Sequence, residues 1–325
     1  MKLRQRIIIL ALGALGVVVG AFAWRPVADF VRGKGPVEPP IAHRTPPKKA
    51  APTPRQLGLP HLQWAEKECD RIVDEHLLVL AGFFSDSKKN TRLFTDEALS
   101  WGSKWRLIAD KVPYTRGGRH EEFIRGEFEE TILKPRQIET AVQQVIRGYI
   151  KEVESIESQM LVRIQADVAD FPVEYPVGAF DNDRLKETYD SAIRQAINAT
   201  QDDAAAGASL EVVSLIVGEV LTQVAVEFGV SAGILGAGAV LSWETLGIGI
   251  VVGVIVDAIV SWVWNWYADP KGELAAKINR KLDDMHNLIV DGSKNVTGLR
   301  ARLRELARKR ARVRETAVLA VLNSP

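Results

Sequence analysis

Residues 245–267, TLGIGIVVGVIVDAIVSWVWNWY, decide how this sequence is interpreted. Eleven of its 23 residues are Val, Ile or Leu, but every fourth residue is small or polar, and this stripe comprises Thr245, Gly249, Gly253, Asp257, Ser261 and Asn265. Residues four apart share one face of an α-helix, and small side chains there allow a second helix to approach closely, as in transmembrane helix pairs. Aromatic residues such as those that end the segment, Trp262, Trp264, Trp266 and Tyr267, are typical of a membrane interface. The segment therefore predicts a helix of bilayer length with one close-packing face.

A second apolar helix is predicted at 205–228, and it carries a four-spaced stripe of its own. The stripe consists of Ser214, Gly218 and Thr222, and we expect it to face Gly249 and Gly253. The two helices would then form a hydrophobic hairpin over residues 201–269, joined by a glycine-rich connector. No Lys, Arg or His occurs between residues 195 and 270, so any charge within the hairpin is negative.

The protonatable residues of the predicted hairpin are Glu211, Glu219, Glu227, Glu244 and Asp257. Insertion of 245–267 into lipid is marginal, because eleven Val, Ile and Leu residues at about −0.3 to −0.6 kcal/mol each offset about +3 kcal/mol for Asp257. Glu219, near the middle of 205–228, opposes insertion of the first helix while it is ionised. We expect Asp257 to face the partner helix and to be hydrogen-bonded by Ser214, Thr222 or Gln223. Burial raises the pKa of a carboxyl group, so acidification would favour insertion. The hairpin lies either in lipid or in the dry core of a helical bundle.

Residues 1–26 predict a signal anchor or a signal peptide. Three basic residues precede an uncharged run at 7–24, and Ala21-Phe22-Ala23 has the form of a cleavage site. The Pro-rich stretch 27–60 is typical of an extended tether, which favours an uncleaved anchor. The positive charge places the start of the chain in the cytoplasm and the rest beyond the membrane, in the periplasm if the source is bacterial. Cleavage after Ala23 would instead make the protein secreted.

The remaining residues show helical periodicity throughout and predict an all-α fold. We divide them into a helical domain at 61–200, the hairpin at 201–269 and a C-terminal helical pair at 270–325. The clearest stripe has spacings of three and four and comprises Ile138, Val142, Val145, Tyr149, Val153, Ile156, Met160, Ile164 and Val168. It predicts a long helix with one apolar face.

The last predicted helix, 296–322, is amphipathic and strongly basic. Its proposed basic surface comprises Arg300, Arg304, Arg308, Arg310 and Arg312. Such a face is expected to lie on anionic lipid, bind an acidic partner, pair with the acidic segment at 121–130, or remain solvated.

No catalytic or cofactor motif is present. The five histidines never occur three or four residues apart, and Cys-x-x-Cys, phosphate-binding loop and Gly-x-Ser-x-Gly patterns are missing. The single cysteine, Cys69, excludes an internal disulfide, and we expect a buried thiol. A net charge of +1 argues against nucleic acid as a partner. We therefore expect a non-enzymatic protein without metal or cofactor, whose partners are the lipid membrane and further copies of itself.

Three functions fit this pattern. The first is a membrane-anchored helical scaffold or oligomerisation protein, in which the hairpin packs helices in or at the membrane. The second is a membrane-inserting protein, because an apolar hairpin enclosed by long amphipathic helices resembles the plan of helical pore-forming proteins such as the colicin channel domain. That resemblance is architectural and covers no motif. The third is a soluble bundle with the hairpin as its dry core.

Overall fold

The computed structural model describes residues 50–100, 119–200, 210–228, 248–264 and 271–323. All of them belong to one compact unit, Ala50–Pro325. Within the described ranges the regular elements are helices, and the only β-type pairing is an isolated antiparallel bridge between Gly292 and Thr297. The predicted all-α fold is therefore confirmed for these residues. The predicted anchor at 1–26 lies outside them.

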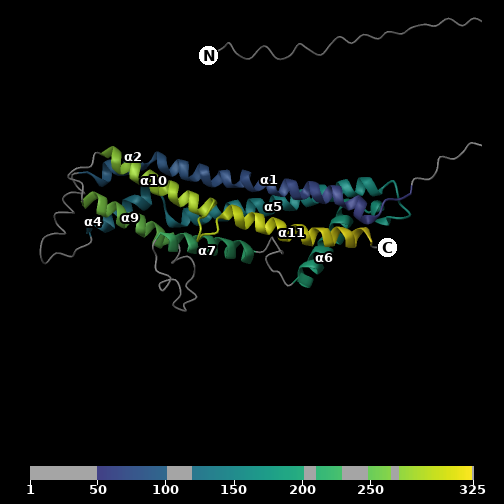
Figure 1. Cartoon of the computed structure of the whole chain (residues 1–325). Helices are drawn as coiled ribbons and strands as arrows, with labels where there is room; N and C mark the ends of the chain where they lie inside the picture. The colour runs from purple at the N-terminus through teal and green to yellow at the C-terminus, as the bar shows by residue number, and fades with distance from the viewer. Residues whose placement is uncertain (1–49, 101–118, 201–209, 229–247, 265–270, 324–325) are drawn as a thin grey trace, which may run out of the picture. The chain divides into compact units, whose positions relative to one another are not determined.

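Figure 1 shows the helices with their labels. In chain order they are α1 (Pro54–Lys89), α2 (Thr91–Ala98), α4 (Arg119–Thr131), α5 (Pro135–Val168), the short 3₁₀ helix η1 (Pro176–Ala179), α6 (Asn182–Thr200), α7 (Leu210–Glu227), α9 (Ile248–Trp264), α10 (Lys271–Val290) and α11 (Leu299–Leu322).

Helix α1 begins at Pro54, within the stretch predicted as an extended tether. The side chain of Thr53 accepts a hydrogen bond from the Gln56 backbone N–H at 3.3 Å, and the Gln56 side chain accepts one from the Thr53 N–H at 2.8 Å. This reciprocal cap satisfies two amide groups that a helix start otherwise leaves unpaired. Pro54 is tolerated because its missing N–H falls where the helix needs no donor. The folded part thus starts earlier than the composition alone indicated.

Helix α5 confirms the clearest periodic prediction, because all nine apolar residues of the stripe Ile138–Val168 are buried. A short break precedes this helix, since α4 ends at Thr131 and α5 starts at Pro135. One face of α5 packs against α1, and the helix also contacts α6, α7 and α9.

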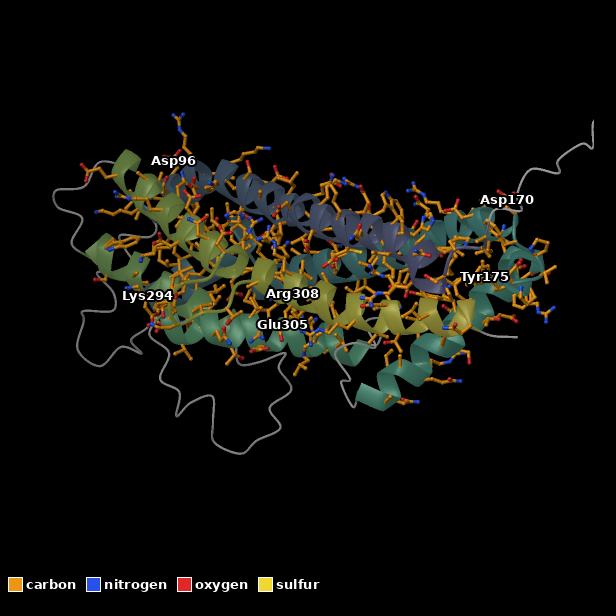
Figure 2. All side chains as sticks on the ribbon, turned by 45° about the vertical axis from the view of Figure 1, so that its right-hand side comes forward. Asp96, Asp170, Tyr175, Lys294, Glu305 and Arg308 are labelled. Atoms are coloured by element: carbon orange, nitrogen blue, oxygen red, sulfur yellow. The ribbon has the colours of Figure 1, made fainter. Side chains whose placement is uncertain are left out.

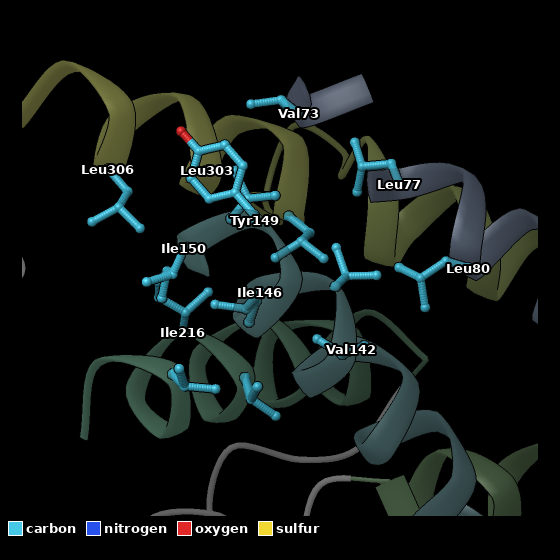
Figure 3. Packing of buried hydrophobic residues seen from close by; sticks show 14 of the residues in the cluster. Val73, Leu77, Leu80, Val142, Ile146, Tyr149, Ile150, Ile216, Leu303 and Leu306 are labelled. Atoms are coloured by element: carbon cyan, nitrogen blue, oxygen red, sulfur yellow. The ribbon is translucent and has the colours of Figure 1, made fainter. Parts of the chain in front are cut away.

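A single apolar cluster joins these helices (Figure 3). In the region shown, α1 contributes Val73, Leu77 and Leu80, and α5 contributes Val142, Ile146, Tyr149 and Ile150. Leu303 and Leu306 of α11 and Ile216 of α7 complete the labelled set. Helix α11 therefore lies in the same core as α1 and α5, although it is more than a hundred residues away in sequence from both.

A tight corner connects α10 to α11 and fixes the direction of α11. Gly292 has a φ of 79°, in the left-handed region, and its N–H bonds to the Asn287 carbonyl at 3.1 Å, as expected for a glycine that ends a helix. A Cβ at Gly292 would collide with the Val296 carbonyl oxygen, and one at Gly298 would collide with the backbone at Asp291 and Gly292. The corner therefore requires glycine at both positions.

Candidate functional site

The two apolar helices that dominate the sequence, α7 and α9, each bury one face. The buried residues are Val212, Val213, Ile216, Val217, Val220, Leu221, Val224 and Ala225 of α7, and Val252, Ile255, Val256 and Ile259 of α9. The helices contact each other, α5 and α10, and α9 also contacts α4. Among the described residues, no helix combines the length and apolarity needed to cross a membrane.

The small-residue stripe of α7 points away from this core. Thr222 is exposed, Ser214 is half-buried, and a Cβ added at Gly218 would meet no atom within 4 Å. Leu215, beside the stripe, is 65% exposed. The expectation that this stripe faces Gly249 and Gly253 is therefore wrong. The reason is that the larger valines and leucines on the opposite side of α7 bury more apolar surface than the small residues can.

The stripe of α9 faces α4 instead of α7. A Cβ at Gly253 would lie 3.5 Å from Nη1 of Arg125, and Ser261 is exposed. Asp257 is 65% exposed, and its Oδ1 lies 3.7 Å from Nη2 of Arg125, which also donates to Glu121 at 3.2 Å. Asp257 was expected to form hydrogen bonds with α7. That prediction is wrong, because Asp257 pairs with α4. The α9 glycine makes room for an arginine rather than for a second backbone.

Glu219, the acid in the middle of α7, is paired with the basic last helix. Nη2 of Arg302 donates to its Oε1, and the Gln223 side-chain amide donates to the same oxygen at 3.2 Å. The side-chain oxygen Oε1 of Gln223 in turn accepts from the Thr297 backbone N–H at 2.6 Å. These bonds link α7 to the start of α11, and they provide the partner without which an ionised acid in an apolar helix is unfavourable.

The remaining predicted residues of this region are partly described. Trp262 is half-buried, with the Lys277 Nζ 5.9 Å from its ring centroid, and Trp264 is the last residue of α9. Glu227 is exposed. Trp266, Tyr267, Glu244 and the side chain of Glu211 lie outside the described part of the chain.

The basic helix α11 mostly pairs with acids of its own bundle. Arg300 bonds to Asp74 and, at 2.8 Å, to Asp291, and Arg304 lies 3.4 Å from Asp74. Arg308 and Arg312 are exposed, and Figure 2 labels Arg308 beside Glu305 on α11. Within the described residues, Arg300 and Arg304 form their ion pairs with α1 and the α10–α11 corner rather than with the acidic segment 121–130.

The assignment of Arg310 to the basic surface was wrong, because this arginine is largely buried. Its side chain is only 13% exposed and forms two parallel hydrogen bonds with Glu157 of α5, each 2.9 Å long. Arg314, one turn further on and 1% exposed, donates to the same carboxylate at 3.1 Å. Nη2 of Arg314 also donates to Sγ of Cys69 at 3.3 Å. We call Cys69, Glu157, Arg310 and Arg314 the buried ionic cluster.

The cluster has a defined protonation state. Burial alone would raise the pKa of Glu157, but the hydrogen bonds and charge of Arg310 and then Arg314 outweigh it and hold the pKa below its ordinary value. Burial raises the pKa of the Cys69 thiol, although Arg314 opposes the shift. Glu157 is therefore ionised and Cys69 neutral at pH 7. The expected buried thiol is confirmed, but an arginine is in contact with it.

Two tyrosines border the cluster, and burial is the main reason that the pKa of each is raised. The hydroxyl oxygens of Tyr149 and Tyr189 are buried and have no hydrogen-bond partner among the described residues. Tyr189 comes from α6, so the cluster region is shared by four helices: α1, α5, α6 and α11.

Sequence reasoning missed the cluster, although a signal was present. Glu157 lies four residues after Val153 and three before Met160, within the apolar stripe of α5. Arg310 and Arg314 follow Leu306 at successive spacings of four, so all three charges occupy positions that the helical period assigns to the core. Opposite charges at core positions of two helices predict a buried ion pair.

The described residues contain no group of three or more His, Cys, Asp or Glu side chains arranged to hold a metal ion. No protein-family model, curated protein or solved structure matches this chain.

Proposed function

We propose that this protein is a membrane-anchored, non-enzymatic helical scaffold whose residues 50–323 form a bundle outside the bilayer. In this proposal α7 and α9 belong to the bundle core, and residues 1–26 attach the bundle to the membrane. The observation that carries it is the contact of Glu219 with Arg302, because it gives the acid in the middle of α7 a partner within the bundle. A helix with that partner and an apolar face in the core gains nothing by moving its charge into lipid.

Self-association is assigned to the outer face of α7. Leu215 and Val226 are exposed there, and Gly218 leaves open space between them. An outer helix face with exposed apolar residues and no basic residue suits contact with a second copy.

The test compares the full chain with a fragment that starts at Ala50, the first residue of the compact unit. After carbonate extraction, we expect the full chain to stay with membranes. The fragment is expected to remain in solution at pH 7 and not to float with liposomes. Sedimentation velocity should show an oligomer that Leu215→Lys converts to a monomer, with the exposed Leu93→Lys as the matched control. Flotation of the fragment at pH 7 would disprove the bundle assignment of α7 and α9.

A second candidate is triggered membrane insertion of α7 and α9. The ion pairs of both helices involve partly exposed carboxylates, since Glu219 is 36% and Asp257 65% exposed. These two ion pairs bind α7 to α11 and α9 to α4 and are both open to solvent, whereas Glu157 is buried in its own cluster. This candidate expects dye leakage from anionic liposomes at pH 4.5 but not at pH 7, and Glu219→Gln should move leakage toward neutral pH.

A further inference from the structure

A cleft opens between α5 and α6, at the place where α6 packs on α11. Its volume is about 450 Å³, within the roughly 300–1,000 Å³ usual for small-molecule sites. Three helices line it, with Leu161 from α5, Tyr189, Ile193 and Arg194 from α6, and Arg310 from α11. The cleft is thus built by segments that are distant in sequence and are held together by the core.

Part of the cleft lining is apolar. Leu161, Tyr189 and Ile193 are all buried, and each lines the cleft. A hydrocarbon group in contact with these side chains would be removed from water, which favours binding. This surface favours a ligand with an apolar body.

The charge behind this surface is positive. Arg314 shares the single carboxylate of Glu157 with a second arginine, and its other bond goes to a thiol whose pKa is raised by burial. A buried guanidinium with half a carboxylate as its counter-charge creates a positive potential in a medium of low dielectric constant. In addition, Tyr189 has a buried hydroxyl with no partner among the described residues, which is uncommon in a native core.

The rim supplies a direct contact for a negative group. Arg194 is exposed at the rim, whereas the neighbouring Lys186 is already paired with Asp190 at 3.0 Å. Glu154 also lines the cleft. An anion is therefore positioned by the Arg194 guanidinium rather than by the total charge of the rim.

We propose that this cleft binds a small amphipathic anion, a carboxylate carried on a short hydrocarbon chain. The chain lies on Leu161 and Ile193, and the carboxylate accepts hydrogen bonds from Arg194. This assignment does not depend on the scaffold function or on where α7 and α9 reside.

Equilibrium dialysis of radiolabelled hexanoate at pH 7 tests the proposal. The full-length protein is held in lipid nanodiscs, and empty nanodiscs are the blank. We expect saturable binding of one hexanoate per chain, displaced by neither inorganic phosphate nor hexyltrimethylammonium. Phosphate lacks the apolar body, and the ammonium has the wrong charge. Displacement by either compound, or the absence of saturable binding above the blank, would overturn the proposal.

Two variants assign the binding to the cleft. Arg194→Glu, at an exposed position, should weaken hexanoate binding by about tenfold or more, because a charge-assisted hydrogen bond is lost and a repulsion is added. Ser158→Phe should abolish binding by filling the cleft. Arg147→Glu, on the exposed side of α5 and outside the cleft, is the matched control and should bind like the wild type. If Arg147→Glu weakens binding as much as Arg194→Glu, general surface charge is responsible and the site does not exist. Circular dichroism checks that each variant is folded. If Ser158→Phe does not fold, Arg194→Glu alone decides whether hexanoate binds in the cleft.

Discussion

Replacing Glu157 by Gln should be among the most destabilising single changes in this bundle. The side chain is 5% exposed and accepts three hydrogen bonds from two guanidinium groups. Gln keeps the size but removes the charge, so Arg314 would stay buried without a counter-ion. Breaking a buried ion pair in this way costs about 3–5 kcal/mol, a large part of the roughly 5–15 kcal/mol that stabilises a typical folded domain.

Thermal unfolding followed by circular dichroism measures this cost. A loss of about 3–5 kcal/mol should lower Tm by roughly 6–10 °C, at about 2 °C per kcal/mol for a unit of this size. The control replaces all three charges at once, with Glu157→Leu, Arg310→Met and Arg314→Leu. Substituting a whole buried ion cluster by apolar residues of similar volume is usually neutral or stabilising. We therefore expect the triple variant to unfold at or above the wild-type temperature.

The pH dependence follows from the lowered pKa of Glu157. Because its folded-state pKa is below the ordinary value of 4.5, the stabilisation is fully present above pH 4.5 and is lost as the pH falls further, through the folded-state pKa. Glu157→Gln should remove this part of the acid sensitivity. A Tm for Glu157→Gln within about 2 °C of the wild type, equivalent to about 1 kcal/mol, would refute the reasoning. A triple variant as unstable as the single one would refute it equally.

Four further changes have expected outcomes of different size. Glu219→Gln should cost only about 1 kcal/mol, because the pair is partly exposed, and hydrogen exchange should rise in α7 more than in α5. Gly292→Ala should destabilise by about 1–3 kcal/mol in urea titrations, since the left-handed backbone and the nearby Val296 carbonyl both oppose a side chain. Gly126→Ala, where a Cβ meets no atom within 4 Å in helix α4, should instead stabilise by about 0.4–1 kcal/mol. Thr53→Ala should cost about 1 kcal/mol through loss of the helix cap, seen as a lower urea midpoint with an unchanged slope.

Helical periodicity predicted which residues share a face, but not which neighbour that face meets. The stripe of α5 was predicted residue by residue, because an eight-turn apolar pattern has only one amphipathic solution. The partners predicted for the stripes of α7 and α9 were wrong, since Gly253 meets Arg125 and Gly218 meets open space. The choice between two apolar faces of one helix depends on total packing, which no local pattern encodes.

Charge was harder to place than apolarity. Arg310 was assigned to the surface because five neighbouring arginines were interpreted as one basic face, although its spacing of four from Leu306 places it on the core side. Its carboxylate partner lies 153 residues earlier in the chain. The helical period places all three charges at core positions, but a separation of that size gives no local sign of which charge pairs with which. The pairing and the cleft beside it therefore emerge only once the helices are packed.

The buried Glu157 and the half-buried Glu219 both have their partners on α11, and this also sets the order in which the protein can fold during synthesis. Glu157 and Glu219 leave the ribosome long before Arg302, Arg310 and Arg314, which are their partners. A nascent chain that stops short of α11 therefore has two carboxylates with no counter-charge at positions meant for the interior. Such a chain is expected to remain incompletely folded and bound to chaperones until its last helix is made. A chain truncated upstream of residue 302 should be degraded rather than accumulate.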